Sequence, residues 1–154
     1  MPKIDIKTAR IREGAGLPAP LHETAIGRIK RVIGEAGGLT DFGVNLVDLP
    51  PGGWSAQRHW HHKEEEFVYV LSGEVALVTD KGEEFLRTGD CAAFPKAVTD
   101  GHHLINRSNV HATYLEIGTR VPGDYAVYPD ADLKIDLSTR SYLHKDGTPY
   151  PKRT

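Results

Sequence analysis

The sequence has 154 residues, a formal net charge of −2, 39% hydrophobic residues and 26% charged residues. This length suits one domain with a real core, the composition excludes a disordered or fibrous chain, and the slightly acidic balance argues against nucleic acid as the partner. No apolar run is long enough to span a membrane, the N-terminus lacks the apolar segment of a signal peptide and the single Cys91 cannot form an internal disulfide, so we expect a cytoplasmic protein.

Residues 1–42 are predicted to be an N-terminal extension. Gly14–Pro20 is a loop by its glycine and proline content. In Thr24–Glu35, isoleucines recur at the spacing of a helix face, whereas β-branched residues and a glycine favour a strand. The extension is therefore predicted to contain a loop followed by a strand or a short helix.

Residues 43–120 are predicted to form an antiparallel β-sandwich or barrel. Short apolar runs alternate with turn signals at a spacing of roughly ten residues, and no helix-length periodic segment lies between them. In the run after Glu66 every residue is apolar, which predicts a strand packed on both faces. The predicted strands are Val44–Leu49, Ser55–Trp60, Glu66–Leu71, Val75–Thr79, Glu83–Leu86, Cys91–Phe94, His103–Asn106 and Thr113–Thr119.

Residues 121–154 are predicted to be a mostly irregular C-terminal tail. They are rich in proline, glycine, aspartate and tyrosine but have little apolar periodicity. The tyrosines favour docking of this tail on its own barrel or on a second subunit over a solvated, frayed end.

Two of the histidines point to metal chemistry. His59 and His61 are two residues apart, so on a strand both imidazoles leave the same face and can bind one divalent metal. Glu66 opens the next strand after a polar turn and can return a carboxylate to the pair. This spacing alone is a weak signal, because surface histidines and acidic loops produce it by chance.

A second stretch, Gly89–Asn109, offers a further ligand. His102 begins another predicted strand, and it can supply a third nitrogen if this strand neighbours the first one in a barrel. Three histidines and one carboxylate with open positions are usual for a reactive rather than a purely structural metal site.

These residues resemble the first conserved motif of the cupin superfamily. That motif is a glycine, five residues, His-x-His, three or four residues, a glutamate, six residues and a glycine. It is matched at every spacing by Gly53, His59, His61, Glu66 and Gly73.

The second cupin motif is matched less completely. It is a glycine, five residues, Pro-x-Gly, two residues, a histidine, three residues and an asparagine. Gly89, Pro95, His102 and Asn106 fit, whereas Ala97 replaces the second glycine and two extra residues precede His102. The wider chain is similar to small bacterial single-domain cupins without an assigned reaction.

The resemblance implies an all-β fold, the double-stranded β-helix or jelly roll, over residues 43–120, with the metal inside one mouth of the barrel. It implies His59, His61, Glu66 and His102 as the ligands of one divalent ion per chain. Zinc, manganese, iron, nickel and copper all suit this donor set, so the sequence does not choose the metal.

Two alternative registers exist for these ligands. Glu65 can replace Glu66, and His103 can replace His102, although His103 would leave the opposite face of its strand. Only Glu66 and His102 keep the motif spacing to the glycine and the asparagine that follow them. We therefore assign Glu66 and His102.

We hypothesise a metal-dependent enzyme of isomerase, lyase or oxygenase type that acts on a small polar metabolite. His103, Tyr69 and Glu65 are candidates for its base. The alternatives are a non-catalytic module that binds or senses a small, sugar-like ligand through the same metal, and a metal-free scaffold with incidental histidines. We also expect a homodimer, because a barrel of this size exposes sheet edges that a partner can cover.

Overall fold

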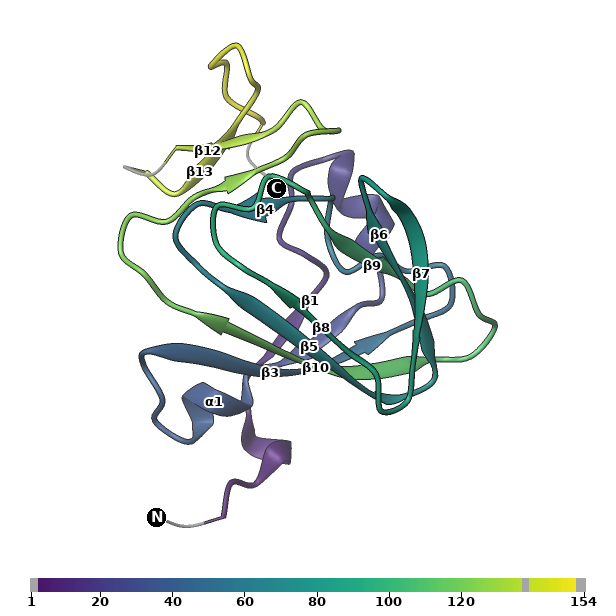
Figure 1. Ribbon diagram of the computed structural model, residues 1–154. Coiled ribbons are helices and arrows are strands. Elements are labelled where there is room, and N and C mark those ends of the chain that lie inside the picture. Colours follow the sequence, from purple (N-terminus) through teal and green to yellow (C-terminus); the bar gives the residue numbers. More distant parts are fainter. Residues whose placement is uncertain (1–2, 137–138, 152–154) are drawn as a thin grey trace.

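The chain folds into a barrel whose walls are two antiparallel sheets (Figure 1). The computed structural model describes residues 3–136 and 139–151. The larger sheet has the strand order β1-β2-β3-β10-β5-β8 and the smaller one the order β7-β6-β9. The architecture confirms the double-stranded β-helix expected from the sequence. The bounds in these two sheets are β1 (Ile11–Glu13), β2 (Ile29–Arg31), β3 (Phe42–Leu49), β5 (Glu66–Ser72), β6 (Glu74–Thr79), β7 (Gly82–Arg87), β8 (Cys91–Phe94), β9 (His103–Ile105) and β10 (Ala112–Thr119).

A third sheet joins the C-terminal segment to the barrel, with the order β13-β12-β11-β4. Its strands are β4 (Trp60–His61), β11 (Ala126–Val127), β12 (Lys134–Asp136) and β13 (Ser141–Leu143). The segment predicted to be mostly irregular thus forms three short strands, which lie together beside β4 (Figure 1). It docks on its own barrel, where Leu17 of the N-terminal loop packs with Tyr128 and Leu133 in a separate apolar cluster.

The N-terminal extension extends the larger sheet, because β2 pairs with β3. The segment Thr24–Glu35, for which helix and strand were both open, contains a central strand between two short helical turns. Gly27, at φ +79°, separates the first turn from the strand. None of the helices in the described ranges is long and apolar enough to cross a membrane. The helical elements are two 3₁₀ helices (Ile6–Thr8 and Leu21–Ala25) and α1 (Ile33–Ala36).

The predicted strands of the barrel are confirmed except for Ser55–Trp60. Only Trp60–His61 is a strand there, because the preceding stretch bonds to β9 irregularly. The Ser55 backbone N–H donates to Leu104 O (2.8 Å), but its side-chain oxygen accepts the return bond from Leu104 N (2.9 Å). A side chain thus replaces the backbone carbonyl that a regular ladder would use.

The expectation that β5 packs on both faces is wrong. Val68 and Val70 are buried against the smaller sheet, whereas Tyr69 is 39% and Leu71 40% exposed. The reason is that the smaller sheet covers only the inward face of the larger one. The outward face of the larger sheet is therefore an exposed apolar surface.

The backbone conformation explains why the first cupin motif ends in a glycine. Gly73 joins β5 to β6 at φ +77°, and a Cβ atom there would lie 2.8 Å from His111 O. Only glycine combines that backbone conformation with so close a contact. The motif spacing from Glu66 to Gly73 therefore fixes where the strand ends and turns.

Candidate metal centre

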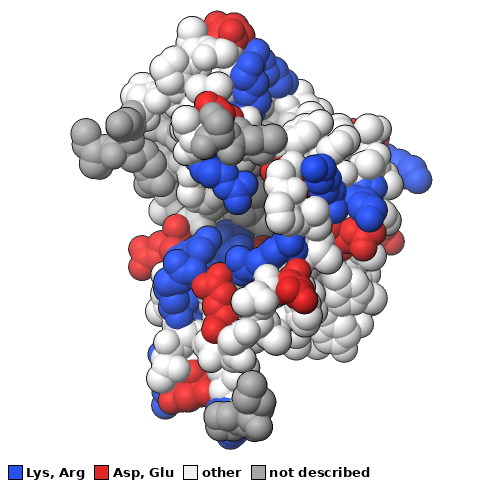
Figure 2. All heavy atoms as spheres, turned by 90° about the vertical axis from the view of Figure 1, so that its left-hand side faces the viewer, with Lys and Arg blue, Asp and Glu red and all other residues white. Residues whose placement is uncertain are grey.

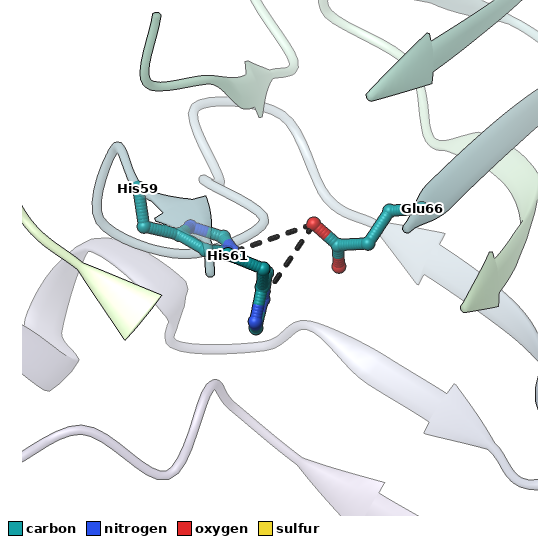
Figure 3. A group of neighbouring side chains, drawn as sticks. All are labelled: His59, His61 and Glu66. Carbon is teal, nitrogen blue, oxygen red and sulfur yellow. Dashed lines mark ion pairs between the residues drawn. The ribbon is translucent and has the colours of Figure 1, made fainter. Parts of the chain in front are cut away.

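Three imidazoles meet one carboxylate oxygen at the mouth of the barrel. Glu66 Oε2 lies 3.0 Å from His102 Nε2 and 3.7 Å from the Nε2 atoms of both His59 and His61. His59 and His61 point toward the Glu66 carboxylate (Figure 3). The four residues that the sequence singled out as ligands therefore lie together.

Backbone pairing brings these residues together. His59 and His102 exchange two backbone hydrogen bonds, of 3.1 and 2.8 Å, so the segments just before β4 and β9 lie side by side. His61 lies on β4, where it pairs with Ala126 of the C-terminal segment. Glu66 is the first residue of β5.

The second ring nitrogens of two histidines are held by acceptors. His59 Nδ1 lies 2.8 Å from Gln57 O, and His61 Nδ1 lies 2.6 Å from Asp124 Oδ2. Carbonyl and carboxylate oxygens only accept, so this network assigns the proton to Nδ1 in both rings. Each Nε2 then presents its lone pair toward Glu66, which is the arrangement of a metal-ligating histidine.

Asp124 is a site residue that the sequence analysis missed. It is buried, and its Oδ1 accepts from Lys63 N (2.6 Å) and Glu64 N (3.1 Å) while its Oδ2 faces His61. It belongs to the segment predicted to be an irregular tail, about sixty positions from its partners. The sequence gives no signal for this pairing, because it depends on where that segment docks.

Aromatic rings lie against two of the three imidazoles, His102 and His59. The Phe94 ring stacks on His102 at a centroid distance of 3.5 Å, and the Tyr128 ring lies 5.6 Å from His59. Such contacts restrict ring rotation and keep the Nε2 atoms directed inward.

The pKa values of Glu66 and His59 favour the protonation states in which these side chains can bind a metal. Burial raises the pKa of Glu66, but the hydrogen bond from His102 and the attraction of His59 and His61 outweigh it and lower the pKa to about 2. Burial lowers the pKa of His59 to about 4. At neutral pH the carboxylate is ionised and His59 is neutral, which are the forms that bind a divalent cation. The donor set of imidazole nitrogens and one carboxylate fits such an ion.

A cavity of about 190 Å³ opens beside these ligands. We call it the inner cavity. Of the described residues lining it, two carry carboxylates, Glu66 and Glu116, and three are tyrosines. Its other polar lining comes from Arg28 and Lys30 of the N-terminal extension, from Ser55 and from the proposed ligands His59 and His102.

A wider hollow of about 510 Å³ adjoins the inner cavity, and we call it the outer hollow. The two share Lys30, Glu66 and Glu116. Figure 2 shows basic side chains gathered around a hollow in the face toward the viewer. The cations that line the outer hollow are Arg12, Lys30, Arg120 and Arg140.

Glu116 is the centre of a charged cluster between the two spaces. Its carboxylate accepts from Arg28 Nη2 (2.9 Å), Lys30 Nζ (2.5 Å) and Asn45 Nδ2 (3.1 Å). Burial raises the pKa of Glu116, but the charges of Lys30 and Arg28 lower it below its usual range. The sequence analysis missed Glu116, because the apolar neighbours Leu115 and Ile117 in the predicted strand Thr113–Thr119 do not indicate that Glu116 faces inward.

The three residues considered as a base lie elsewhere. His103 is buried with its Nδ1 3.0 Å from Ala56 O and its ring edge-on to Trp54. Tyr69 is on the exposed outward face, and Glu65 is exposed with its backbone N–H donating to Thr119. None of the three lines the inner cavity, because neighbouring strand residues point to opposite faces.

Ala97, the departure from the second motif, adopts a glycine-like backbone. Its φ is +60°, in the left-handed region, and its N–H donates to His61 O (2.8 Å). The alanine at the position of the motif glycine thus adopts a conformation that favours glycine. The turn still ties the β8–β9 loop to the strand that carries His61.

Comparisons with known proteins agree with this geometry. Residues 45–118 match the family model of the cupin domain. A sugar phosphate isomerase of the cupin superfamily from Silicibacter pomeroyi is 43% identical, with 97% of each chain covered and a TM-score of 0.90. A protein from Acidithiobacillus ferrooxidans, provisionally described as a sugar phosphate isomerase, is 28% identical, with 92% of this chain and 91% of that chain covered and a TM-score of 0.75.

More distant structures share the fold alone. The polyketide cyclase RemF from Streptomyces resistomycificus is 19% identical, with 77% of this chain and 79% of that chain covered and a TM-score of 0.59. A search of functionally curated proteins gives no match.

Proposed function

The chain belongs to the cupin superfamily, and from this premise we propose that it is a metal-dependent isomerase of a small sugar phosphate. The reaction class is supported by the isomerase from Silicibacter pomeroyi, which is 43% identical over 97% of both chains. It is also the chemistry that needs least from the site, because isomerisation of an aldose to a ketose is redox-neutral and uses no co-substrate.

The convergence of three Nε2 atoms on one carboxylate oxygen is the observation that carries the proposal. His59, His61, Glu66 and His102 would hold the ion. A bound divalent ion would act as a Lewis acid on a substrate carbonyl or hydroxyl oxygen. Their approach to 3.0–3.7 Å, with two rings oriented from behind, supports a prearranged site.

Glu116 is the group that we assign to proton transfer. Aldose–ketose isomerisation moves a proton between the two carbons of a hydroxy-carbonyl unit. Besides the ligand Glu66, Glu116 is the carboxylate among the described residues that lines the inner cavity, and its lowered pKa keeps it ionised at neutral pH. Lys30 Nζ, 2.5 Å from Glu116, can stabilise charge that develops on a substrate oxygen.

The phosphoryl group is assigned to the outer hollow. Lys30 and Arg120, which line it, pair with Glu116 and Glu35, whereas Arg12 and Arg140 line it without a carboxylate ion pair within residues 3–136 and 139–151. Guanidinium groups suit phosphate because they donate two parallel hydrogen bonds. The shared residues Lys30 and Glu116 would let one molecule reach from this hollow to the metal ligands.

A non-catalytic sugar-binding protein is the second candidate. One observation favours it: three donors already hold the Glu116 carboxylate, and this lowers its strength as a base. The same metal and cavity would then capture a sugar phosphate without turning it over.

The test is metal content and turnover of tagless protein, with His59→Ala and Glu66→Ala as variants and His111→Ala as control. His111 is exposed and pairs with Asp48. We expect about one metal ion per chain in the wild type and the control, and its loss in both site variants, which remain folded. Aldose phosphates of three to six carbons should be converted to ketose phosphates by the wild type only.

Full metal occupancy in either site variant would refute the ligand assignment. Stabilisation of the wild type by a sugar phosphate without product would favour the binding protein.

We also propose that the chain is a homodimer. The outward face of the larger sheet exposes apolar side chains, including Phe42, Tyr69 and Leu71 at 41%, 39% and 40%. A second copy would cover them. Light scattering at micromolar concentration should give twice the monomer mass, and a monomeric mass would contradict the proposal.

A further inference from the structure

One arginine beside a proposed ligand ties three other segments of the chain together. Arg58 directly precedes His59, and its side chain is only 12% exposed. Its Nε and Nη2 donate to the two carboxylate oxygens of Asp130 in the C-terminal segment, at 2.6 and 3.0 Å. Its Nη1 donates to Gly101 O at 3.1 Å and to the carboxylate of Asp80 in the turn between β6 and β7. A planar guanidinium with these partners holds the segments in one arrangement.

The loop that Arg58 holds is the one in which the second motif departs from the cupin pattern. Two extra residues lie between Pro95 and His102. A longer loop loses more conformational freedom when it is ordered, so it needs contacts that keep it in place. Gly101 is packed between two such contacts, because a Cβ atom there would lie 3.1 Å from Pro129 Cγ and 3.4 Å from Arg58 Cγ. The lengthened loop is therefore held between Arg58 and the C-terminal segment.

The turn between β6 and β7 joins the same arrangement. Asp100 Oδ1 accepts a hydrogen bond from the Asp80 backbone N–H at 2.7 Å and lies 3.9 Å from Arg58 Nη1. The side chains of Asp80, Asp100 and Asp130 are 57%, 29% and 61% exposed. Ion pairs with carboxylates this exposed contribute little to the free energy of unfolding. Their main effect is to fix the segments that they join.

These contacts lie next to two of the proposed ligands. Arg58 precedes His59 and Gly101 precedes His102. The hydrogen bond from Arg58 to Gly101 thus joins the two segments one residue before each imidazole. The link from Arg58 to the C-terminal segment also holds the stretch whose Tyr128 ring lies against His59. Loss of the guanidinium would therefore release both imidazoles from their present positions.

We propose that Arg58 is a positioning residue for the candidate metal centre. It holds the lengthened β8–β9 loop in the place that brings His102 to the same ion as His59. The inference rests on the proposed function, since it concerns the same ligands. It adds a residue that touches neither the ion nor the substrate but determines how tightly the ion is held.

Charge and geometry predict opposite effects of removing Arg58. Its positive charge repels a cation held by His59, so loss of the charge alone would tighten metal binding. Loss of positioning would weaken metal binding, because partners behind the ligands typically contribute about 10–100-fold to metal affinity. The direction of the change in affinity therefore separates the two effects.

The experiment compares Arg58→Gln with the control Arg107→Gln, and cobalt(II) is the probe. Arg107 binds both carboxylate oxygens of Glu83 through the same Nε and Nη2 atoms, but it lines neither the inner cavity nor the outer hollow. Chelator competition measures the cobalt affinity, and the visible absorption bands of bound cobalt report the geometry of its ligands. We expect Arg58→Gln to weaken cobalt binding about tenfold and to shift these bands, and Arg107→Gln to change neither.

The inference is overturned if folded Arg58→Gln keeps the wild-type absorption bands and binds cobalt as tightly as the wild type or more tightly. A lower unfolding temperature with unchanged cobalt binding overturns it too, because Arg58 is then a structural residue only. If Arg58→Gln does not fold, Asp130→Ala removes one exposed partner of the guanidinium instead. We then expect cobalt affinity to fall about twofold to fivefold, and an unchanged affinity overturns the inference.

The two proposals fail separately. A wild type that binds cobalt and isomerises sugar phosphates, with cobalt binding unchanged in Arg58→Gln, fails this inference alone. A wild type that binds no cobalt fails the proposed function, and the imidazole nitrogen resonances of the metal-free protein then decide the inference. Displaced resonances of His59 and His102 in Arg58→Gln, but not in Arg107→Gln, support it, and unchanged resonances overturn it.

Discussion

The two ends of the barrel are built on the same three strands but with different side chains. Along the inward faces of β3, β5 and β10, two residues of the apolar core are followed by one polar residue at the open end. The closed end packs into one apolar cluster, and the open end forms the candidate metal centre and the cluster around Glu116. The inward positions, from closed end to open end, are Leu49, Val47 and Asn45 on β3, Val70, Val68 and Glu66 on β5, and Ala112, Tyr114 and Glu116 on β10.

This difference shows a division of labour along single strands. Apolar burial at the closed end stabilises the fold, at about 25 cal/mol for each Å² removed from water. At the open end, buried charges lower stability but create a site. Changes at the closed end should therefore alter stability and spare the metal, and changes at the open end should do the reverse.

The largest expected effect is at the closed end. Leu49 is fully buried, so Leu49→Ala should leave a cavity and lower the free energy of unfolding by about 2–5 kcal/mol. Urea denaturation measures this, and metal analysis should still give wild-type stoichiometry. Leu39→Ala, at a side chain that is 40% exposed and lies outside that sheet, is the matched control, with a loss below about 1 kcal/mol. Loss of metal from folded Leu49→Ala would contradict the division between the ends.

At the open end of the metal-free protein, protonation of His59 should make the free energy of unfolding depend on pH. The pKa of His59 is about 4 in the folded state against 6.5 ordinarily, so the unfolded chain binds more protons between these values. The free energy of unfolding should therefore fall as pH drops from 6.5 to 4, by at most about 3 kcal/mol. Urea denaturation of chelator-treated protein measures it, and His59→Gln should remove this dependence.

Protonation of Glu66 affects the free energy of unfolding in a lower pH range. Its pKa of about 2 lies below the usual 4.5, so its contribution to stability is present above pH 4.5 and is lost as pH falls toward 2. A free energy of unfolding that does not change between pH 6.5 and 4 would show that His59 is not buried in its neutral form.

Asp124→Asn tests the support behind the metal centre. An amide NH₂ facing His61 would favour the proton on Nε2 and so oppose metal binding. We expect metal affinity to fall about 10–100-fold, with little change in stability because the backbone donors Lys63 and Glu64 keep an acceptor oxygen. Competition with a chelator measures the affinity. Asp132→Asn, beside His144 and away from the site, should leave the affinity unchanged.

The smallest expected effect is at Ala97. Its left-handed φ of +60° favours glycine, so Ala97→Gly should raise the free energy of unfolding by about 0.5–1 kcal/mol. Ala93→Gly in strand β8 should lower it by a similar amount. A lower stability of Ala97→Gly would mean that the alanine methyl group contributes packing that outweighs the backbone cost.

Much of the barrel follows from local patterns. Short apolar runs between turn residues predicted most strands, because alternating burial and turn chemistry are local properties. The prediction of a strand over Ser55–Trp60 failed because the Ser55 side chain replaces a backbone hydrogen-bond partner. The exposed face of β5 was missed because apolar content does not reveal which face of a strand is covered. The extension stayed ambiguous because its strand is stabilised by pairing with β3, which lies outside the segment whose pattern was read.

The candidate site likewise contains residues that local patterns located and residues that they did not. The motif spacing located His59, His61, Glu66 and His102, which lie together at the mouth of the barrel. The residues around them were not predictable, because Arg28, Asp124 and Glu116 reach the site only through long-range pairing of strands. A base was sought among sequence neighbours of the ligands, but the side chains that line the cavity come from distant strands.

The contribution of Asp124 also has a consequence for biosynthesis. Residues 59–119 supply the imidazoles and carboxylates, but the aspartate that orients His61 belongs to a segment added to the growing chain afterwards. While the ribosome still holds that segment, the nascent barrel has the proposed metal ligands but not the group that sets the tautomer of His61. If these residues hold a metal, we expect tight capture of it only after the segment with Asp124 has emerged and docked.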